Sequence, residues 1–567
     1  MKFNASNRKK LKMGALSWGL TVVIVSIVIV ANVIFSALAQ KHLWGVDLTP
    51  ELLYSLSDDC IALIRDGKDI YSEQTTSPIE KIDQVRAELL AEDPDADVDS
   101  VRINIIFCDD PDVVKANKTQ RYVYNTALEL QEEFPGYINV EHRNIIKNPS
   151  SVAKYRETTL TTIDTDSVIV EFGTEYRVRT LRSFFTFNSD SDEEPWAYNG
   201  EKGFCAAIMA VTRAFSPIAC ITTNHGEGMY DDELWQTLED AGYKVQLLDL
   251  LAEDIPQDCR LMVVFDPQKD FGTTNGGIVA RDNDEIAKLD AFLDNSSSLM
   301  VFVDADTPPL PNFEEFLEEW GIVLDRTQIG EDTVSHMIMD KSQSLDAAGQ
   351  IFKADYVTTG WGAQLTADMR SRPTPPAIIF SNAISLSTPS TYKLTRYTPE
   401  EGSESETNVP YDYYYYNGNG VNRETFDIFV TSSEAQAYAG GDVVERATES
   451  NRMSLMTVTK EIKIKSESNY SAVDEASYVI ACGSTEFAGE AFLQSGAYGN
   501  TDALMTAFRT IGREAVPVGL LPNPFADYTI DTITTSEATQ YTVVLATIPA
   551  VAALALGIVV IVRRKNR

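Results

Sequence analysis

The sequence predicts a two-anchor membrane protein of the α/β class, and three observations lead to this prediction. Residues 16–38 and 541–562 carry no charged side chain, and each span is long enough to cross a hydrocarbon core of roughly 30 Å as a helix. Between the spans, strand-like and helix-like segments alternate, which is typical of α/β domains. The alternation breaks at Ser216-Pro217 and then resumes, so we expect two domains.

Both termini are predicted to be cytoplasmic and the body of the chain extracytoplasmic. Residues 1–15 and 563–567 carry nine basic residues and no acidic ones, and short flanks rich in Lys and Arg stay on the cytoplasmic side of the cell membrane. The alternative is a signal peptide that is cleaved after Ala39, at Ala37-Leu38-Ala39. The length of the first span favours an uncleaved anchor, because the apolar regions of signal peptides run about 7–15 residues.

The negative charge of the protein is concentrated between the spans. The chain has a net charge of −37, and all 84 acidic residues lie between the spans with only 38 of the 47 basic residues, which gives −46 there. Because each phosphate contact needs a Lys or an Arg, this balance excludes nucleic acid as a partner. The six cysteines are scattered without a CxxC pair, so we expect neither a disulfide framework nor a thiol-redox site.

Residues 43–217 are predicted to form the first α/β domain. Its elements follow the order β-α-β-α-β-β-α, which is that of thioredoxin-like folds, although the redox dithiol is missing. Ser57 is the expected N-cap of a helix over the apolar residues 61–64. The expected strands are 103–108, 138–143, 167–172 and 176–181, and the expected helices are 122–134, 150–156 and 201–215.

Residues 218–520 are predicted to form the second domain, a doubly wound parallel sheet. Strands alternate there with helices that carry apolar residues on one face. The pattern loosens from about 326 to 455, which we interpret as an irregular insertion, and residues 521–540 are a polar stalk. The expected strands are 218–223, 245–250, 261–265, 299–303 and 478–481, and the expected helices are 231–242, 285–293, 313–320 and 502–511.

The loop after the first strand of the second domain is the leading candidate for a site. It reads Thr223-Asn224-His225-Gly226-Glu227-Gly228, and ligands in open α/β sheets bind beyond the carboxyl ends of the strands. His225 and Glu227 can form an acid–base pair beside Asn224. The alternative is a tight loop in which His225 and Glu227 satisfy local backbone groups. The glycine spacing is not that of a dinucleotide-binding loop.

Two aspartates follow neighbouring strands and are further candidate ligand-binding residues. Asp266 ends the strand 261–265 and Asp304 follows 299–303, although Asp304 also suits a turn before Pro308. The chain contains no nucleophile elbow, and Cys482-Gly483-Ser484, the nearest approach, lacks a positioned histidine. Four histidines leave little material for a zinc site. We therefore expect no catalytic residue, no metal and no cofactor.

A series of short motifs occurs in a characteristic order along nearly the whole chain. The motifs are Asp47-Leu48-Thr49, Tyr54-Ser55-Leu56-Ser57, Gly200-Glu201, Ala206-Ala207-Ile208, His225-Gly226-Glu227, Gly242-Tyr243, Leu247-Leu248-Asp249-Leu250, Ile255-Pro256, Asp266-Pro267 and Gly483-Ser484-Thr485-Glu486-Phe487. Together they resemble the GldG-like auxiliary subunits of ABC-type transport systems. The chain departs from that family where Asn224 replaces a usual Gly, where Asn295-Ser296-Ser297-Ser298 replaces a Gly-Gly pair, and where Ser484 replaces a common acidic residue.

The resemblance implies a membrane subunit that works with an ABC permease and an ATPase and has no established catalytic residues. It also implies that the second domain is amidotransferase-like without the cysteine nucleophile. We therefore expect a non-catalytic accessory subunit that binds a substrate, a small-molecule ligand or a cell-envelope partner and contacts the lipid bilayer. The alternatives are a membrane-tethered hydrolase or amidotransferase-like enzyme that uses His225 and Glu227, and a free-standing surface adhesin that uses Tyr411-Asp412-Tyr413-Tyr414-Tyr415-Tyr416.

Overall fold

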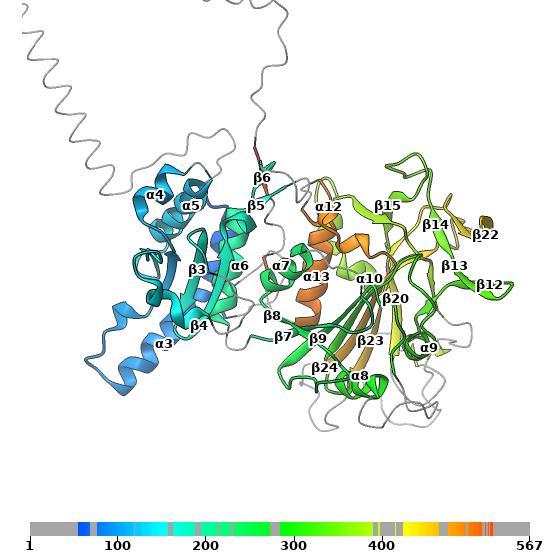
Figure 1. Ribbon diagram of the computed structural model, residues 1–567, viewed down its shortest axis with the longest axis horizontal. Helices are drawn as coiled ribbons and strands as arrows, with labels where there is room; N and C mark the ends of the chain where they lie inside the picture. Colours follow the sequence, from blue (N-terminus) through cyan, green and yellow to red (C-terminus); the bar gives the residue numbers. More distant parts are fainter. Residues whose placement is uncertain are drawn as a thin grey trace, which may run out of the picture. The chain divides into compact units, whose positions relative to one another are not determined.

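The computed structural model is shown in Figure 1. It describes residues 55–67, 76–117, 119–156, 163–187, 194–213, 216–227, 232–272, 284–388, 395–396, 414–415, 423–463, 475–494, 497–512, 516–517, 520 and 522–525. The chain divides after Pro524, and every helix and strand below belongs to the unit that ends there.

The first sheet has four strands in the order β2-β1-β3-β4. β1 runs parallel to β2 and antiparallel to β3, and β3 and β4 form an antiparallel hairpin. All six residues of β3 are buried: helix α6 packs against this strand, and Val152 and Tyr155 belong to the cluster around Ile169. The strands are β1 (Ile103–Phe107), β2 (Ile138–His142), β3 (Ser167–Phe172) and β4 (Glu175–Thr180), and the helices around them are α2 (Asp58–Asp66), α3 (Pro78–Glu92), α4 (Pro111–Ala116), α5 (Gln120–Glu133) and α6 (Gly200–Thr212).

The second sheet is larger, and one half of it is parallel. In this half the strands lie in the order β8-β7-β9-β10-β24, and all neighbours are parallel. The strands are β7 (Ile218–Thr222), β8 (Lys244–Leu248), β9 (Cys259–Phe265), β10 (Ser298–Phe302) and β24 (Glu475–Cys482). Numbered along the chain, this order is 2-1-3-4-5, so the order reverses between β7 and β9.

The other half of this sheet is antiparallel, which corrects the predicted doubly wound parallel sheet. β24 pairs with β23, and the sheet continues through β20 and β15 to β16, with every pair antiparallel. The reason is that the chain between β10 and β24 forms long strand pairs rather than crossover helices, so the fold is α/β with mixed sheets. These strands are β15 (Ile351–Tyr356), β16 (Ile378–Ser381), β20 (Arg423–Val430) and β23 (Ser454–Lys463).

The segment 326–455, expected to be irregular, also contains smaller β-structures. β12 and β13 form a hairpin, and β14, β21 and β22 form a three-stranded antiparallel sheet. Short β11 and β17 join this region to β23 of the large sheet. The bounds are β11 (Val323–Leu324), β12 (Arg326–Ile329), β13 (Asp332–Ser335), β14 (Met337–Met339), β17 (Leu386–Ser387), β21 (Gln436–Ala439) and β22 (Asp442–Arg446).

Two hydrophobic cores cover the opposite faces of the large sheet. Successive residues of a strand point to opposite faces, so Ile221 belongs to one core and Cys220 to the other. Helices α7 (Asp232–Asp240) and α13 (Asn500–Gly512) contribute Leu234 and Phe508 to the first core. Helices α8 (Glu285–Asp294) and α9 (Pro311–Glu319) contribute Leu289 and Phe313 to the second core. The helices thus lie on both faces of the parallel half.

The prediction of a two-anchor membrane protein is not supported by the structure. In the part of the chain that is described, no helix is both long and apolar enough to span a bilayer. The longest helix there is α3, with 15 residues, and at 1.5 Å per residue it extends only about 22 Å against a core of roughly 30 Å. The predicted spans 16–38 and 541–562, with their flanks 1–15 and 563–567, lie outside the described residues.

One contact between helix α10 (Gly360–Leu365) and β20 leads to a stability prediction. A Cβ atom on Gly362 would lie 1.9 Å from the backbone oxygen of Asp427, so Gly362→Ala must push the helix away from the strand. We expect a loss of about 3 kcal/mol in the free energy of unfolding, measured by urea denaturation. Gln364→Ala, at an exposed position of the same helix, is the control and should change stability by less than about 0.5 kcal/mol. Equal effects of the two substitutions would contradict the close approach.

Candidate functional site

The sequence-predicted loop lies where the strand order of the parallel half reverses. Residues 223–227 follow β7 and residues 266–272 follow β9, and these two strands are neighbours. The loops are tied together, because the backbone N–H of Gln268 donates to the carbonyl of His225 at 2.9 Å. In sheets of this order, ligands bind beyond the carboxyl ends of the strands at such a reversal. The location therefore agrees with a binding site.

Three residues near this edge adopt left-handed backbone conformations. Asn224 has φ 82°, Asp266 has φ 46° and Asn382 has φ 50°, and they follow β7, β9 and β16 respectively. Asn and Asp tolerate this region better than other residues with a Cβ atom. This explains how Asn224 occupies a position where glycine would be the simplest choice.

His225 is enclosed by two carboxylates and an aromatic ring. Its side chain is almost fully buried, with Nδ1 3.1 Å from Glu227 Oε1 and Nε2 3.0 Å from Glu285 Oε1. The contact to Glu285 is an ion pair rather than a well-aligned hydrogen bond. Phe271 stacks on the imidazole, with ring centroids 3.9 Å apart and planes 12° from parallel. The imidazole therefore has a carboxylate within contact distance of each ring nitrogen.

The two carboxylates determine the charge of His225. Burial alone lowers the pKa of the imidazole, but the close contacts and negative charges of Glu227 and Glu285 outweigh burial and raise the pKa from 6.5 to about 9. His225 is therefore an imidazolium at neutral pH. An imidazolium held by two carboxylates has no free lone pair with which to accept a proton. This arrangement is a poor general base.

The supporting loop is fixed by the first turns of two helices. Gly272 N–H donates to Glu285 Oε2 at 2.7 Å, and Glu285 N–H donates to the carbonyl of Gly272 at 3.0 Å. Asp270 accepts from the backbone N–H groups of Asn312 and Phe313 at the start of α9, at 2.9 and 3.1 Å. The loop after β9 thus joins α8 to α9. His225 lies in a rigid setting.

Asp304 and Asp266 lie at the same edge, as the sequence predicted. Asp304 is buried and accepts from the backbone N–H groups of Asp306 and Thr307, at 2.8 and 3.1 Å, and from Thr485 Oγ1 at 2.6 Å. The turn expected at Asp304 is therefore confirmed, and its carboxylate also joins the loops after β10 and β24. Its role as a ligand-binding residue stays a prediction. Burial, followed by the charge of Asp304, raises the pKa of Asp266.

The cysteines of the described chain offer no exposed nucleophile. All six are free and buried. Cys482, at the end of β24, donates from Sγ to the carbonyl of Ser484 at 3.4 Å, and burial raises the pKa of its thiol well above the usual range. A thiol in this environment is inert. Of the tyrosine-rich run 411–416, only Tyr414–Tyr415 belongs to the described residues, as a short strand paired with Thr395–Arg396.

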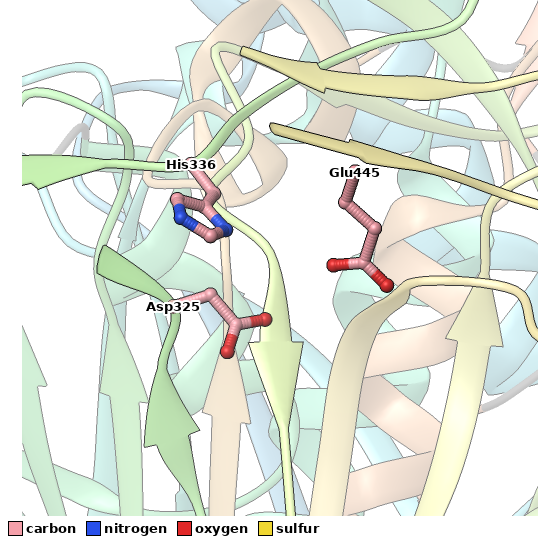
Figure 2. A group of neighbouring side chains, drawn as sticks. All are labelled: Asp325, His336 and Glu445. Atoms are coloured by element: carbon pink, nitrogen blue, oxygen red, sulfur yellow. The ribbon is translucent and has the colours of Figure 1, made fainter. Parts of the chain in front are cut away.

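A second group of side chains was not predicted from the sequence. Asp325, His336 and Glu445 come from the β-structures of segment 326–455 and its border, and Figure 2 shows the ring and the two carboxylates facing one another. One ligand atom from each residue lies within 4.8 Å of the other two, and all three residues are partly buried. These are residue types that hold divalent metal ions. Their separation along the chain left no local motif that could have revealed them.

Two other partners of the predicted site were missed for a similar reason. Glu285 and Phe271 complete the surroundings of His225 but lie far from it in sequence. Glu285 stands at the start of a predicted helix, where an acidic residue is common. Only the short-range pair of His225 and Glu227 carried a sequence signal.

No protein-family model matches this chain, and no curated protein matches it. Three solved structures resemble it weakly: the N-terminal domain of mmIFT52 (11% identity, 53% of this chain, 99% of that one, TM-score 0.31) and two cytoplasmic proteins from Salmonella typhimurium. The latter have 11% and 8% identity, cover 52% of this chain and 99% and 98% of their own, and have TM-scores of 0.24 and 0.22. Likenesses at this level carry no argument about function.

These results correct the description of the chain as a GldG-like transmembrane subunit of an ABC transporter. That description depended on the order of short motifs, each of which is weak alone. No family match supports it, and no membrane-crossing helix occurs among the residues that the structure describes. The motifs that do fall on described elements have local structural roles, such as the turn after β7 and the loop after β24.

Proposed function

We propose that this protein is a non-catalytic binding protein. The observation that carries the proposal is the enclosure of His225 by Glu227, Glu285 and Phe271. The position where an α/β enzyme of this strand order would present reactive groups is occupied by a closed ion cluster. Its groups satisfy one another rather than facing a substrate. This supports a site that recognises a ligand without transforming it.

The binding region that we propose is the carboxyl edge beside this cluster. Asp266, in the loop after β9, and Asp306, in the loop after β10, offer carboxylate oxygens there, and Asp304 shares the loop of Asp306. No salt bridge neutralises these three carboxylates within the described parts of the chain. Hydrogen-bond donors with positive charge are the natural partners of such oxygens. The ligand class that fits is therefore a molecule that presents an amine.

Calorimetric titration with spermidine, as an amine probe, tests this proposal. We expect binding to the full-length protein, and we expect Asp266→Asn to raise the Kd about tenfold, because one charge-assisted contact contributes about 1.4 kcal/mol. Asp332→Asn, at an exposed position of the β12–β13 hairpin, is the matched control for the general attraction of an acidic surface and should leave the Kd unchanged. Equal spermidine affinities of the wild type, Asp266→Asn and Asp332→Asn would contradict a binding region at Asp266.

A second measurement separates binding from catalysis. His225→Gln keeps a polar side chain but removes the imidazole, and it should produce no change in hydrolysis of ester and amide probes. If the wild-type protein hydrolysed such a probe and His225→Gln abolished that turnover while the protein stayed folded by circular dichroism, the enzyme alternative would replace the binding proposal.

A further inference from the structure

We infer that Asp325, His336 and Glu445 form a binding site for one divalent transition-metal ion, with Zn²⁺ as the best fit. Asp325 lies between β11 and β12, His336 lies between β13 and β14, and Glu445 is on β22 (Figure 2). The ligand atoms approach one another from three separate segments, within 4.8 Å. This inference is independent of the proposed function, because the site lies on other elements.

Two of the three ligands are held by a closed set of backbone hydrogen bonds. The N–H of Asp325 donates to the carbonyl of Ser385, the N–H of Ser385 donates to the carbonyl of His336, and the N–H of His336 donates to the carbonyl of Asp325, all between 2.9 and 3.0 Å. Such reciprocal bonds fix the relative positions of the Asp325 and His336 backbones. The site is therefore preorganised, which favours metal affinity.

The side chain of Asp325 is oriented by two hydroxyl groups. Ser385 Oγ donates to Asp325 Oδ2 at 2.7 Å, and Ser387 Oγ donates to Oδ1 at 2.6 Å. Each carboxylate oxygen has two lone pairs, so one on each oxygen remains for a metal. Hydrogen bonds from such outer partners orient the carboxylates that bind metals.

The imidazole of His336 supplies the strongest indication of a metal. Its Nε2 is 2.6 Å from Thr327 Oγ1, whereas its Nδ1 is buried without a hydrogen-bond partner. When Nε2 carries the proton and donates it to Thr327, Nδ1 presents a bare lone pair toward the two carboxylates. A buried polar atom without a partner is unfavourable. A metal ion between Nδ1 and the carboxylates would satisfy it.

The donor set and the charge select the type of ion. One imidazole nitrogen with two carboxylates suits Zn²⁺, whereas Mg²⁺ and Ca²⁺ prefer oxygen ligands alone. In the described part of the chain, no Lys or Arg forms a salt bridge with Asp325 or Glu445. A divalent cation would neutralise the two negative charges of these carboxylates. Bonds of about 2.0–2.2 Å would bring tetrahedral ligand atoms to about 3.4 Å from one another. The Glu445 carboxylate accepts a hydrogen bond of 3.4 Å from Asn451, which is longer than those on Asp325 and His336, so its side chain is the ligand best able to move inward.

Zinc titration of the full-length protein, after removal of metals with a chelator and dialysis, tests the inference. We expect one equivalent of Zn²⁺ to bind with a Kd of about 1 μM or lower, and a thousandfold excess of Mg²⁺ to leave it bound. His336→Gln and Glu445→Gln should each weaken binding about 100-fold, and Thr327→Val about tenfold. His142→Gln, which removes a histidine elsewhere, and Asp442→Asn, at an exposed position of β22, are the controls.

Two outcomes would overturn the zinc site at Asp325, His336 and Glu445. Unchanged zinc affinity in both His336→Gln and Glu445→Gln, with thermal unfolding showing that the variants fold, would overturn the inference. X-ray absorption of the zinc-loaded protein should show nitrogen and oxygen neighbours at about 2.0–2.1 Å. A shell of sulfur at about 2.3 Å would instead place the metal on the cysteines and would likewise overturn it.

Discussion

Replacing His225 by alanine is expected to lower the free energy of unfolding by about 3–5 kcal/mol at pH 7. The substitution leaves Glu285, which is 1% exposed, and Glu227 facing one another without the cation that both contact. Removing one partner of a buried ion cluster costs this much because the remaining charges are uncompensated. Phe271 also loses the ring on which it stacks. Urea denaturation should show a lower midpoint with an unchanged slope.

The matched control removes a cation from an exposed ion pair. Lys147 lies 2.5 Å from Asp110, with side chains that are 72% and 38% exposed. Because solvent screens exposed pairs, Lys147→Ala should have a small effect on stability. If His225→Ala were no more destabilising than Lys147→Ala, the carboxylates around His225 would have to be solvated, against the burial described above.

The dependence of this effect on pH has a defined sign. The pKa of His225 is raised from 6.5 to about 9 in the folded protein, so protonation stabilises the fold. At 1.36 kcal/mol per pH unit, this corresponds to about 3 kcal/mol. The stabilisation is complete below pH 6.5 and is lost as the pH rises through about 9. The difference in stability between wild type and His225→Gln should therefore narrow between pH 6.5 and pH 10, and a constant difference would show that the ring is neutral.

The parallel half of the large sheet could be predicted from the sequence, but the antiparallel half could not. Strands β7, β9 and β10 alternate with helices over short distances, so each is visible as a local pattern. β24 pairs with β10 although the paired residues Ser298 and Tyr478 are 180 positions apart, and β20 pairs with β23 through contacts that no local period encodes. The predicted parallel sheet was wrong because it extended the local pattern across that long segment.

The candidate sites show the same limit. His225 and Glu227 are two residues apart and share a turn, so their contact could be predicted from the sequence. The charge of His225, however, also depends on Glu285, which lies in the first turn of α8 and helps to keep the histidine a buried cation. The group of Asp325, His336 and Glu445 spans 120 residues. Its members become neighbours only through the pairing of short strands.

Removing the charge of Asp240 is the second substitution for which we expect a large effect. Asp240, at the end of α7, forms an ion pair with Arg179 of β4, and both side chains are less than 8% exposed. The same helix end is contacted by Arg213, whose Nη1 donates to the carbonyl of Ala241 at 2.7 Å. This pair joins the first sheet to a helix of the second. Asp240→Asn keeps the shape of the side chain but removes the charge that the buried Arg179 guanidinium contacts directly, while the nearby charge of Glu239 remains.

We expect Asp240→Asn to cost about 3–5 kcal/mol. It should also increase hydrogen exchange in β4 more than in β9 or β10, because the lost ion pair joins β4 to the end of α7. Lys244→Ala is the control, because Lys244 of β8 forms an exposed ion pair at 3.0 Å with Glu175 of β4. This substitution should cost less than about 1 kcal/mol. The double variant Arg179→Met/Asp240→Asn removes both charges and should recover part of the loss, because an apolar side chain replaces the unpaired cation. Additive losses in the double variant would mean that the two residues act through separate packing contacts, and the ion pair would then not be what couples the two sheets.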